Sequence, residues 1–366
     1  MIDVNDEIIM GYNSTWEYIF GYENVERVTY IYLIPLVCLP GSVAAVLSAI
    51  VFARLRQNSL EILLCGLSLF DVVILLSSLF MFPAMHECSR IDQALQQSSM
   101  VCHFFWRSTV SLFPISLISQ AGSIFTYVAV TVDRFIAVTF PLKKRVWATR
   151  NKSTTVLICI TVVSTLFKLP SFFEVALNEN GQSVTTTLRE NKFYTEIYLL
   201  YLYFFLMQLI PWTIIIFLNA YIIHKVRLAY RVQEAMIHGK PKTKREDAER
   251  KVTVMAIVMT CIFIICNIPP GINNLVEEYG DRAYFRQRIP LSNLLVCFNS
   301  ASNVMIYCVF NTRFRRAALQ ILGFSTKNPT RAGSVITKIT KEDGVGMLRS
   351  RISTYETLNG VEPTAC

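Results

Sequence analysis

Charged residues are scarce in this sequence. Asp, Glu, Lys and Arg make up 17% of its 366 residues, whereas hydrophobic residues make up 53%. A soluble domain needs more charge than this to cover its surface, so the composition argues against a soluble fold. The formal net charge of +9 does not indicate binding to nucleic acid, because the basic residues fall in short segments between apolar runs rather than on one face.

Also absent are the residue patterns that carry chemistry. We find no internal repeat, metal-ligand cluster, phosphate-binding loop or nucleophile paired with a base. The four histidines stand near the ends of apolar runs or between them, where solvated surface explains them better than metal binding. Most of the ten cysteines lie inside apolar runs, which excludes a disulfide-rich secreted scaffold. We therefore expect neither an enzyme nor a bound organic cofactor.

Seven runs of the sequence are long and apolar enough to cross a bilayer as helices. Spanning about 30 Å of hydrocarbon takes roughly 20 apolar residues, and the backbone must be helical there because lipid offers it no hydrogen-bond partner. We therefore predict an all-α membrane protein, built as a seven-transmembrane helix bundle. The predicted spans are 30–53, 62–84, 108–132, 153–173, 197–223, 252–276 and 289–310.

The distribution of Lys and Arg predicts the orientation of the chain. The segments 54–60, 139–152 and 224–251 carry 16 of these residues, whereas the segments on the opposite side carry 8. Since basic residues accumulate in short cytoplasmic loops, we expect a multi-pass plasma-membrane protein with its N-terminus outside and its C-terminus in the cytoplasm. Asn13, in an Asn-Ser-Thr triplet of the outer segment, is then a candidate glycosylation site. Such triplets also arise by chance, and Asn151 begins one on the cytoplasmic side.

The segment after the last apolar run predicts a short amphipathic cytoplasmic helix on the membrane surface, because Arg313, Arg315 and Arg316 alternate with apolar residues. The remainder of the chain is polar and rich in Ser and Thr, which predicts a disordered tail. The predicted organisation is an extracellular N-terminus at 1–29, a transmembrane domain at 30–310, the amphipathic helix at 311–324 and the cytoplasmic tail at 325–366.

A few polar residues interrupt the apolar runs and must face the interior of the bundle. Asp71 is the one carboxylate in the middle of a run, where a charge costs at least about 2.5 kcal/mol. Spacings of three and four residues align two further polar stripes: Ser116, Gln120, Ser123 and Tyr127 in the third run, and Asn299, Asn303 and Tyr307 in the seventh. Two interpretations stay open, a hydrated core that rearranges when the bundle switches and a set of hydrogen bonds that joins the helices. The energetic cost favours a function for Asp71.

Charged residues at the cytoplasmic ends of two spans suggest a switchable ion pair. Asp133 and Arg134 end the third run, and Glu249 lies near the start of the sixth. A pair between Arg134 and Glu249 would hold the bundle closed, and opening the bundle would release Arg134. The alternative interpretation is that these are ordinary interfacial charges.

Five segments, in order on the predicted helices, resemble the signature motifs of rhodopsin-like (class A) G-protein-coupled receptors. The motifs are 67–71 for the second-helix acid, Asp133-Arg134-Phe135 for Asp-Arg-Tyr, Pro211 for the fifth-helix proline, 266–269 with Phe263 for Cys-Trp-x-Pro, and 303–307 for Asn-Pro-x-x-Tyr. Within this family, Phe113-Pro114, 169–174, 266–269 and 299–310 are similar to invertebrate FMRFamide-type neuropeptide receptors.

The resemblance implies a short amidated peptide ligand, often ending in Arg-Phe-amide, and coupling to a heterotrimeric G protein by movement of the sixth helix. It also implies arrestin and receptor kinases as partners. For ligand binding it implies Ser116, Gln120, Phe172, Phe173, Glu174, Asn267, Glu277 and Glu278. For coupling and switching it implies Asp133, Arg134, Glu249, Phe263, Pro269, Asn303 and Tyr307. Interfacial anchoring is the alternative explanation for the aromatic and acidic residues at the outer helix ends.

The sequence departs from the family pattern at several positions. Asn267 replaces the sixth-helix tryptophan, and Val304 replaces the seventh-helix proline. The segment 174–196 contains no cysteine, so the family's usual bridge to this loop cannot form. Cys88 and Cys102 are left as a candidate pair that would close a local loop.

The resemblance also suggests an ion site. Asp71, Ser123, Asn299 and Asn303 match positions that bind a sodium ion in the family. One carboxylate and three neutral oxygen groups suit a hard cation in principle. Because Asn267 alters the neighbourhood, a bound sodium ion and a plain hydrogen-bond network both stay open.

Two other functions are alternatives to that of a peptide receptor. An orphan chemosensory receptor for environmental small molecules would share the same helices and motifs. A transporter or channel would show repeat symmetry and paired charges at the membrane midplane, which a single acid and no repeat argue against. Amine and retinal ligands are disfavoured by the resemblance, because Ser116 stands where amine receptors carry an aspartate and 289–312 lacks the lysine of an opsin.

Overall fold

The computed structural model is predominantly helical and describes residues 22–55, 58–90, 99–178, 183–235, 244–279 and 282–323. Asn13 and the predicted tail at 325–366 lie outside the described residues. The α-helices are α2 (Tyr22–Arg27), α3 (Ile34–Leu55), α4 (Ser59–Arg90), α6 (Met100–Thr139), α7 (Pro141–Trp147), α8 (Arg150–Lys168), α9 (Thr187–Glu190), α10 (Ile210–Ala235), α11 (Lys244–Tyr279), α12 (Arg282–Phe310) and α13 (Thr312–Ile321). The π-helical stretches are η1 (Val28–Leu33), η3 (Tyr194–Leu202) and η4 (Phe204–Leu209), η2 (Leu169–Phe173) is a 3₁₀-helix, and the strands are β1 (Val175–Leu177) and β2 (Ser183–Thr185).

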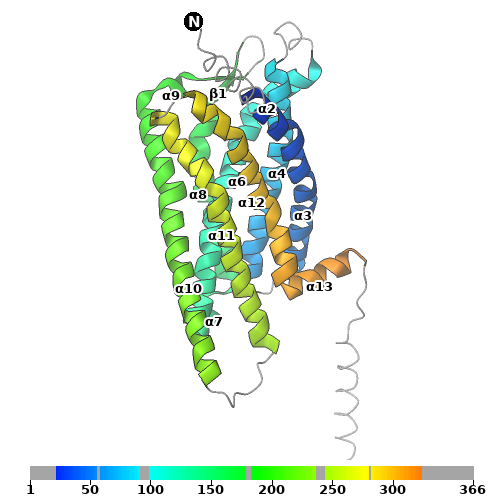
Figure 1. Cartoon of the computed structure of the whole chain (residues 1–366), viewed down its shortest axis with the longest axis vertical. Helices are drawn as coiled ribbons and strands as arrows, with labels where there is room; N and C mark the ends of the chain where they lie inside the picture. Colours follow the sequence, from blue (N-terminus) through cyan, green and yellow to red (C-terminus); the bar gives the residue numbers. More distant parts are fainter. Residues whose placement is uncertain are drawn as a thin grey trace, which may run out of the picture. The chain divides into compact units, whose positions relative to one another are not determined.

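The predicted seven-helix bundle is confirmed for the described part of the chain (Figure 1). The helical segments long and apolar enough to cross a membrane are Asn24–Leu55, Ser59–Arg90, Met100–Thr139, Arg150–Phe173, Tyr194–Ala229, Asp247–Asn273 and Arg288–Phe310. Most of them extend beyond the predicted apolar runs, and α6 begins eight residues before its predicted start at 108. Hydropathy marks the part of a helix that faces lipid, whereas backbone hydrogen bonds continue the helix past the hydrocarbon.

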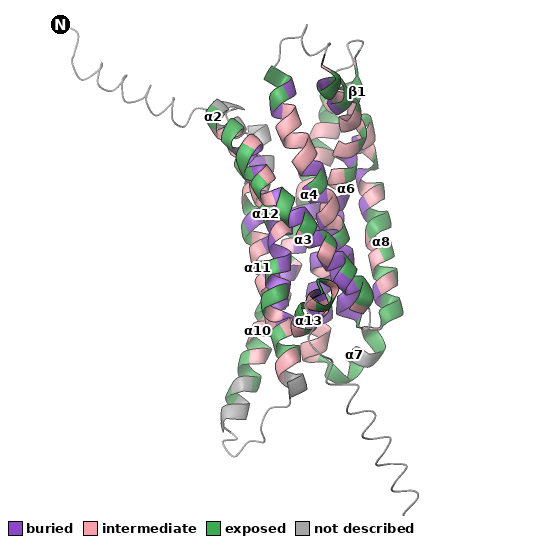
Figure 2. Ribbon diagram, turned by 90° about the vertical axis from the view of Figure 1, so that its right-hand side faces the viewer, coloured by how far each residue is buried: buried purple, intermediate pink, exposed green. Residues whose placement is uncertain are grey.

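Helices from distant parts of the sequence pack side by side in the bundle. α4 packs between α3 and α6, α12 packs on α11 and α3, and α10 packs on α6. A Cβ atom added to Gly41 would lie 2.8 Å from the Cβ of Ala301, so α3 and α12 approach too closely there for a larger residue. α8 packs on α4 and α6, and Figure 2 shows most of its residues as exposed or intermediate.

Apolar side chains cover the outer faces of the bundle. Leu36, Val43 and Met305 are 69%, 71% and 71% exposed. Exposing such side chains to water would cost free energy in proportion to their area, so the outer faces need lipid around them. The chain is therefore a multi-pass membrane protein whose polar side chains gather inside.

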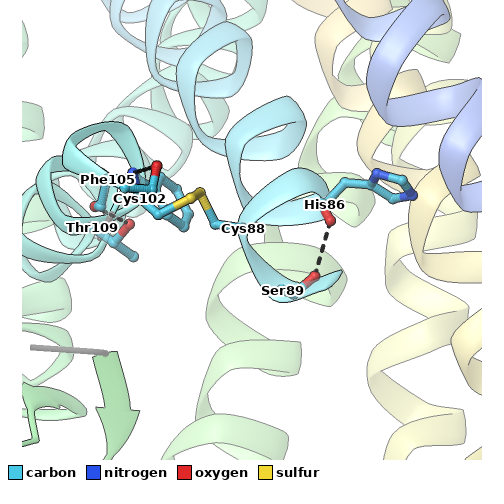
Figure 3. Close-up of a disulfide and its surroundings, with 7 residues drawn as sticks. His86, Cys88, Ser89, Cys102, Phe105 and Thr109 are labelled. Atoms are coloured by element: carbon cyan, nitrogen blue, oxygen red, sulfur yellow. Dashed lines mark hydrogen bonds between the residues drawn. A yellow bond between two sulfur atoms is a disulfide. The ribbon is translucent and has the colours of Figure 1, made fainter. Parts of the chain in front are cut away.

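A small hairpin and a disulfide close one end of the bundle, which we call the hairpin end. Strands β1 and β2 are antiparallel, with Val175 opposite Thr185. A disulfide joins Cys88 near the end of α4 to Cys102 in the first turn of α6 (Figure 3). Both cysteines pack with Phe105 in a buried apolar cluster. The disulfide thus fixes the ends of two helices that pack against each other along their length.

The opposite end carries α7 and the start of α13. The side-chain oxygen of Asn311 accepts hydrogen bonds from the backbone N–H groups of Arg313 and Phe314, which caps the first turn of α13. The Phe314 ring is fully buried and lies 5.1 Å from the ring of Phe52 and 5.5 Å from that of Tyr307. This apolar contact holds the beginning of α13 against α3 and α12.

We predict that the disulfide stabilises the bundle by about 3 kcal/mol, because it closes a loop of 14 residues between two packed helices. Cys88→Ser, Cys102→Ser and the double variant should then lose equal stability, measured by unfolding in bicelles without reductant. Cys159→Ser, at an exposed free thiol, serves as the control. A double variant clearly less stable than either single variant would contradict the pairing.

Candidate functional site

A cavity of about 390 Å³ lies among α4, α6, α12 and the hairpin. Its walls are mainly aromatic, aliphatic and methionine side chains. The residues that line it are Ile74, Ser78, Met81, Phe82, Met85, Phe105, Trp106, Thr109, Phe113, Ser116, Leu117, Gln120, Val175, Val184, Thr185, Arg189, Asn293 and Val296. A concave, mostly apolar cavity with a few convergent polar groups is the usual form of a ligand site.

The deep end of the cavity is polar but uncharged. Gln120 is the lining residue of α6 farthest from the hairpin end, and its amide makes no hydrogen bond within the described part of the chain. The hydroxyl oxygens of Ser116 and Ser77 lie 3.0 Å apart. The Asn293 amide donates to the Tyr30 hydroxyl at 3.1 Å. The deep end can therefore donate and accept hydrogen bonds, but it offers no charge to a ligand.

The cavity contains part of the set that the sequence predicted for ligand binding. Ser116 and Gln120 line it, whereas Asn267, Glu174 and the adjoining aromatic pair Phe172 and Phe173 do not. The side chains of Glu277 and Glu278 lie outside the described residues. The described lining comes from α4, α6, α9, α12 and the strands β1 and β2, and none of it from the described part of α11. The predicted ligand contacts of the sixth helix stay a prediction.

Glu174 lies inside the wall behind the cavity. Its side chain is 3% exposed and accepts hydrogen bonds from the Ser171 hydroxyl at 2.9 Å and the Tyr194 hydroxyl at 2.8 Å. The Arg189 guanidinium lies 3.8 Å from its other carboxylate oxygen. A buried carboxylate is stable only with such partners, which explains why Glu174 does not turn to the cavity.

Asn267 also turns to its own helix. Its amide nitrogen donates to the backbone carbonyl of Phe263 at 2.8 Å, and the residue is 8% exposed. Pro269 and Pro270 follow inside α11. Proline supplies no backbone N–H, so it removes a helical hydrogen bond and weakens the helix locally. This segment of α11 is suited to bending.

Below the cavity, the two polar stripes meet at Asp71 as the sequence predicted. The Asn303 amide nitrogen donates to the Asp71 carboxylate at 2.8 Å, and the Tyr127 hydroxyl donates to the Asn303 amide oxygen at 2.9 Å. The Asn299 amide oxygen lies 3.4 Å from the same hydroxyl. The Tyr127 ring stacks on Phe263 with centroids 4.5 Å apart. We call Asp71, Tyr127, Phe263, Asn299 and Asn303 the polar node, because they join four helices: α4, α6, α11 and α12.

The polar node contains oxygen atoms of the kind that bind a hard cation, but two of them already face the Tyr127 hydroxyl. One Asp71 carboxylate oxygen, Oδ1, has no hydrogen-bond partner in the described part of the chain, and Ser123 is buried at 4% exposure. Oxygen ligands of this kind suit sodium. The amide oxygens of Asn299 and Asn303 already face the Tyr127 hydroxyl. A sodium ion held by Asp71, Ser123, Asn299 and Asn303 therefore stays a prediction.

At the other end of α6, Arg134 forms an ion pair with its neighbour Asp133, and both are 5% exposed. The Ser59 hydroxyl donates to Asp133 at 2.5 Å, which holds the carboxylate against the start of α4. Glu249 is exposed on α11. The predicted pair of Arg134 with Glu249 stays a prediction, and the arginine contact that the structure displays is local to α6.

Seven membrane-spanning helices that enclose a ligand-sized cavity and a polar node are typical of seven-helix membrane receptors. Residues 43–307 match the family described as 7 transmembrane receptor (rhodopsin family), and the chain therefore belongs to this family. The family is a class of receptors rather than of enzymes.

The chain is similar to several known receptors of this family. The chain is 27% identical over 299 residues to the FMRFamide receptor of Drosophila melanogaster, which covers 79% of this chain and 53% of that protein. It is 29% identical to the FMRFamide peptide receptor frpr-18 of Caenorhabditis elegans, over 78% of this chain and 67% of that protein. It is 26% identical to the somatostatin receptor type 1 of Rattus norvegicus, over 83% of this chain and 74% of that protein. The chain thus spans about half the length of the fruit fly receptor.

Tyr127→Phe should destabilise the folded protein by about 1–3 kcal/mol, because it removes the hydroxyl that the buried amide oxygens of Asn299 and Asn303 face. The ring and its stacking on Phe263 are retained. Chemical unfolding in bicelles measures the change, with Tyr32→Phe, at a position 58% exposed, as the matched control. Equal stability of the two variants would show that the Tyr127 hydroxyl does not stabilise the fold.

Proposed function

We propose that this chain is a plasma-membrane receptor for a short peptide with an aromatic, amidated end, and that it transmits peptide binding to a heterotrimeric G protein. The observation that carries the proposal is the cavity, whose aromatic and methionine walls surround an unengaged Gln120 amide. The names of the relatives, which refer to FMRFamide, support the same ligand class.

The chemistry of the cavity favours an amide over a free carboxylate at the inserted end. A carboxamide both donates and accepts hydrogen bonds, which matches the side chains of Gln120, Ser116 and Asn293. A carboxylate would lose its hydration at the deep end without gaining a cation, because Arg189 is the one ionisable residue of the described lining and belongs to the hairpin side. The aromatic side chain would pack among Phe82, Phe113 and their neighbours.

Signal transmission would pass along α6 to the polar node. Gln120 and Tyr127 lie seven residues apart on this helix, which is two turns or about 10 Å. Tyr127 contacts α12 through Asn303 and α11 through Phe263. A peptide that binds more tightly when these contacts are rearranged shifts the population toward that state. Movement of α11 away from α6 would then expose the buried Arg134 to the G protein.

The same proposal sets the orientation of the chain. The hairpin end faces outward with the peptide, and the end with α7 and α13 faces the cytoplasm, in agreement with the distribution of Lys and Arg. The G protein, arrestin and receptor kinases would act on the cytoplasmic end, and Asn13 would be available for glycosylation outside.

In cells that express the chain, Phe-Met-Arg-Phe-amide should activate G proteins at least about 100-fold more potently than the same peptide with a free carboxylate, because the carboxylate would be buried unpaired. Gln120→Leu should remove most of this preference while it preserves the volume of the side chain. G-protein activation and surface expression are measured together.

Two further measurements separate peptide binding from G-protein coupling and a peptide receptor from a chemosensory one. Arg134→Ala should bind the amidated peptide and fail to activate the G protein, which separates binding from coupling. If a broad panel of amidated peptides neither binds nor activates the wild-type receptor, whereas environmental small molecules do, the chemosensory alternative replaces the peptide receptor.

A further inference from the structure

The wall of the cavity holds two cations beside one carboxylate. Glu174 forms an ion pair with Arg189, on α9, at 3.8 Å, and interacts electrostatically with Lys168, at the end of α8. Lys168 is 3% exposed, interacts electrostatically with Glu174, and has its ammonium 4.2 Å from the centre of the Tyr203 ring. A lysine buried this deeply requires a counter-ion, and Glu174 is the carboxylate beside it. One positive charge is left over.

Of the two cations, Arg189 is the one that lines the cavity. Its guanidinium makes no hydrogen bond within the described part of the chain, and its distance of 3.8 Å to the Glu174 carboxylate is too long for one. The side chain is 37% exposed and lines the cavity. A guanidinium carries five N–H donors, so most of the donors of Arg189 are available to a ligand. The neighbouring Glu190 is exposed and forms no ion pair with Arg189 in the described residues.

We propose that Arg189 is an anion-binding subsite of the cavity that receives a carboxylate of the peptide ligand. This inference rests on the proposed function, since it names the chemistry of the outer part of the same ligand. A carboxylate fits the planar fork of a guanidinium with two hydrogen bonds. The contact of Arg189 with Glu174, at 3.8 Å and without a hydrogen bond, can persist while the remaining N–H donors bind the ligand.

The dimensions of the cavity place the acidic residue along the peptide. Gln120 marks the deep end and Trp106 the level of the hairpin end, and these lining residues are 14 positions apart on α6, or about 21 Å. An extended peptide covers about 3.3–3.6 Å per residue. The carboxylate should therefore lie about six residues from the amidated end, and not beside the aromatic residue that enters first.

The test compares Asp-Gly-Phe-Met-Arg-Phe-amide with Asn-Gly-Phe-Met-Arg-Phe-amide, which differ by one charge at the sixth residue from the amide. On the purified full-length receptor, the Asp peptide should bind about fivefold more tightly than the Asn peptide. Arg189→Gln should abolish this ratio, Arg189→Lys should retain part of it, and Lys192→Gln, at an exposed cation three residues away, should leave it unchanged.

Equal affinities of the two peptides for the wild-type receptor would overturn the subsite while leaving the peptide-receptor function intact. If Arg189→Gln does not fold, the ratio of affinities on the wild type must fall toward one as salt is raised, and a salt-independent ratio overturns the proposal.

If neither peptide binds, the proposed function fails. The subsite is then tested by thermal unfolding of the receptor with N-acetyl-aspartate or N-acetyl-asparagine at millimolar concentration. Greater stabilisation by the acid in the wild type than in Arg189→Gln supports the subsite, and equal shifts overturn it.

Discussion

A single buried carboxylate determines how the interior of this bundle must be arranged. Asp71 is 1% exposed in a helix whose outer face is apolar, so its polar partners have to come from neighbouring helices. Asn303 provides the direct hydrogen bond, and Tyr127 connects that amide to α6. The contact of Tyr127 with Phe263 extends the network to α11. Any change in the relative position of these helices must break or exchange bonds at the polar node, which makes it a natural two-state element.

The ligand cavity depends on a different set of constraints at the hairpin end. The disulfide fixes α4 to α6, and the hairpin lies over the cavity because Glu174 and Thr186 are joined through their backbones at 2.9 Å. The Glu174 carboxylate binds Ser171, Tyr194 and Arg189, so this acidic residue stabilises the wall and does not face a basic ligand in the cavity. The charge of the cavity is consequently set by Arg189.

Much of the architecture could be predicted from the sequence, because hydropathy and helical spacing are local. The seven spans, the short helix after them and the meeting of the Asp71, Tyr127 and Asn303 stripes follow from these patterns. The location of the cavity could not be predicted in the same way. It depends on the side chains that α4, α6, α12 and the hairpin turn toward one another, and on Tyr194 and Arg189 contacting Glu174 from different elements. The concentration of Met81, Phe82 and Met85 at the end of α4 was the available signal, and in the sequence it resembled ordinary lipid-facing surface.

The central claim is that Asp71 and Asn303 act as one unit within the polar node. A double-mutant cycle with Asp71→Ala, Asn303→Ala and the double variant, measured as free energies of unfolding in bicelles, tests this most directly. Because the two side chains share a buried hydrogen bond, the account predicts a coupling free energy of at least about 1 kcal/mol. Effects that add within about 0.3 kcal/mol would contradict it, since they would mean that the two residues stabilise the bundle independently.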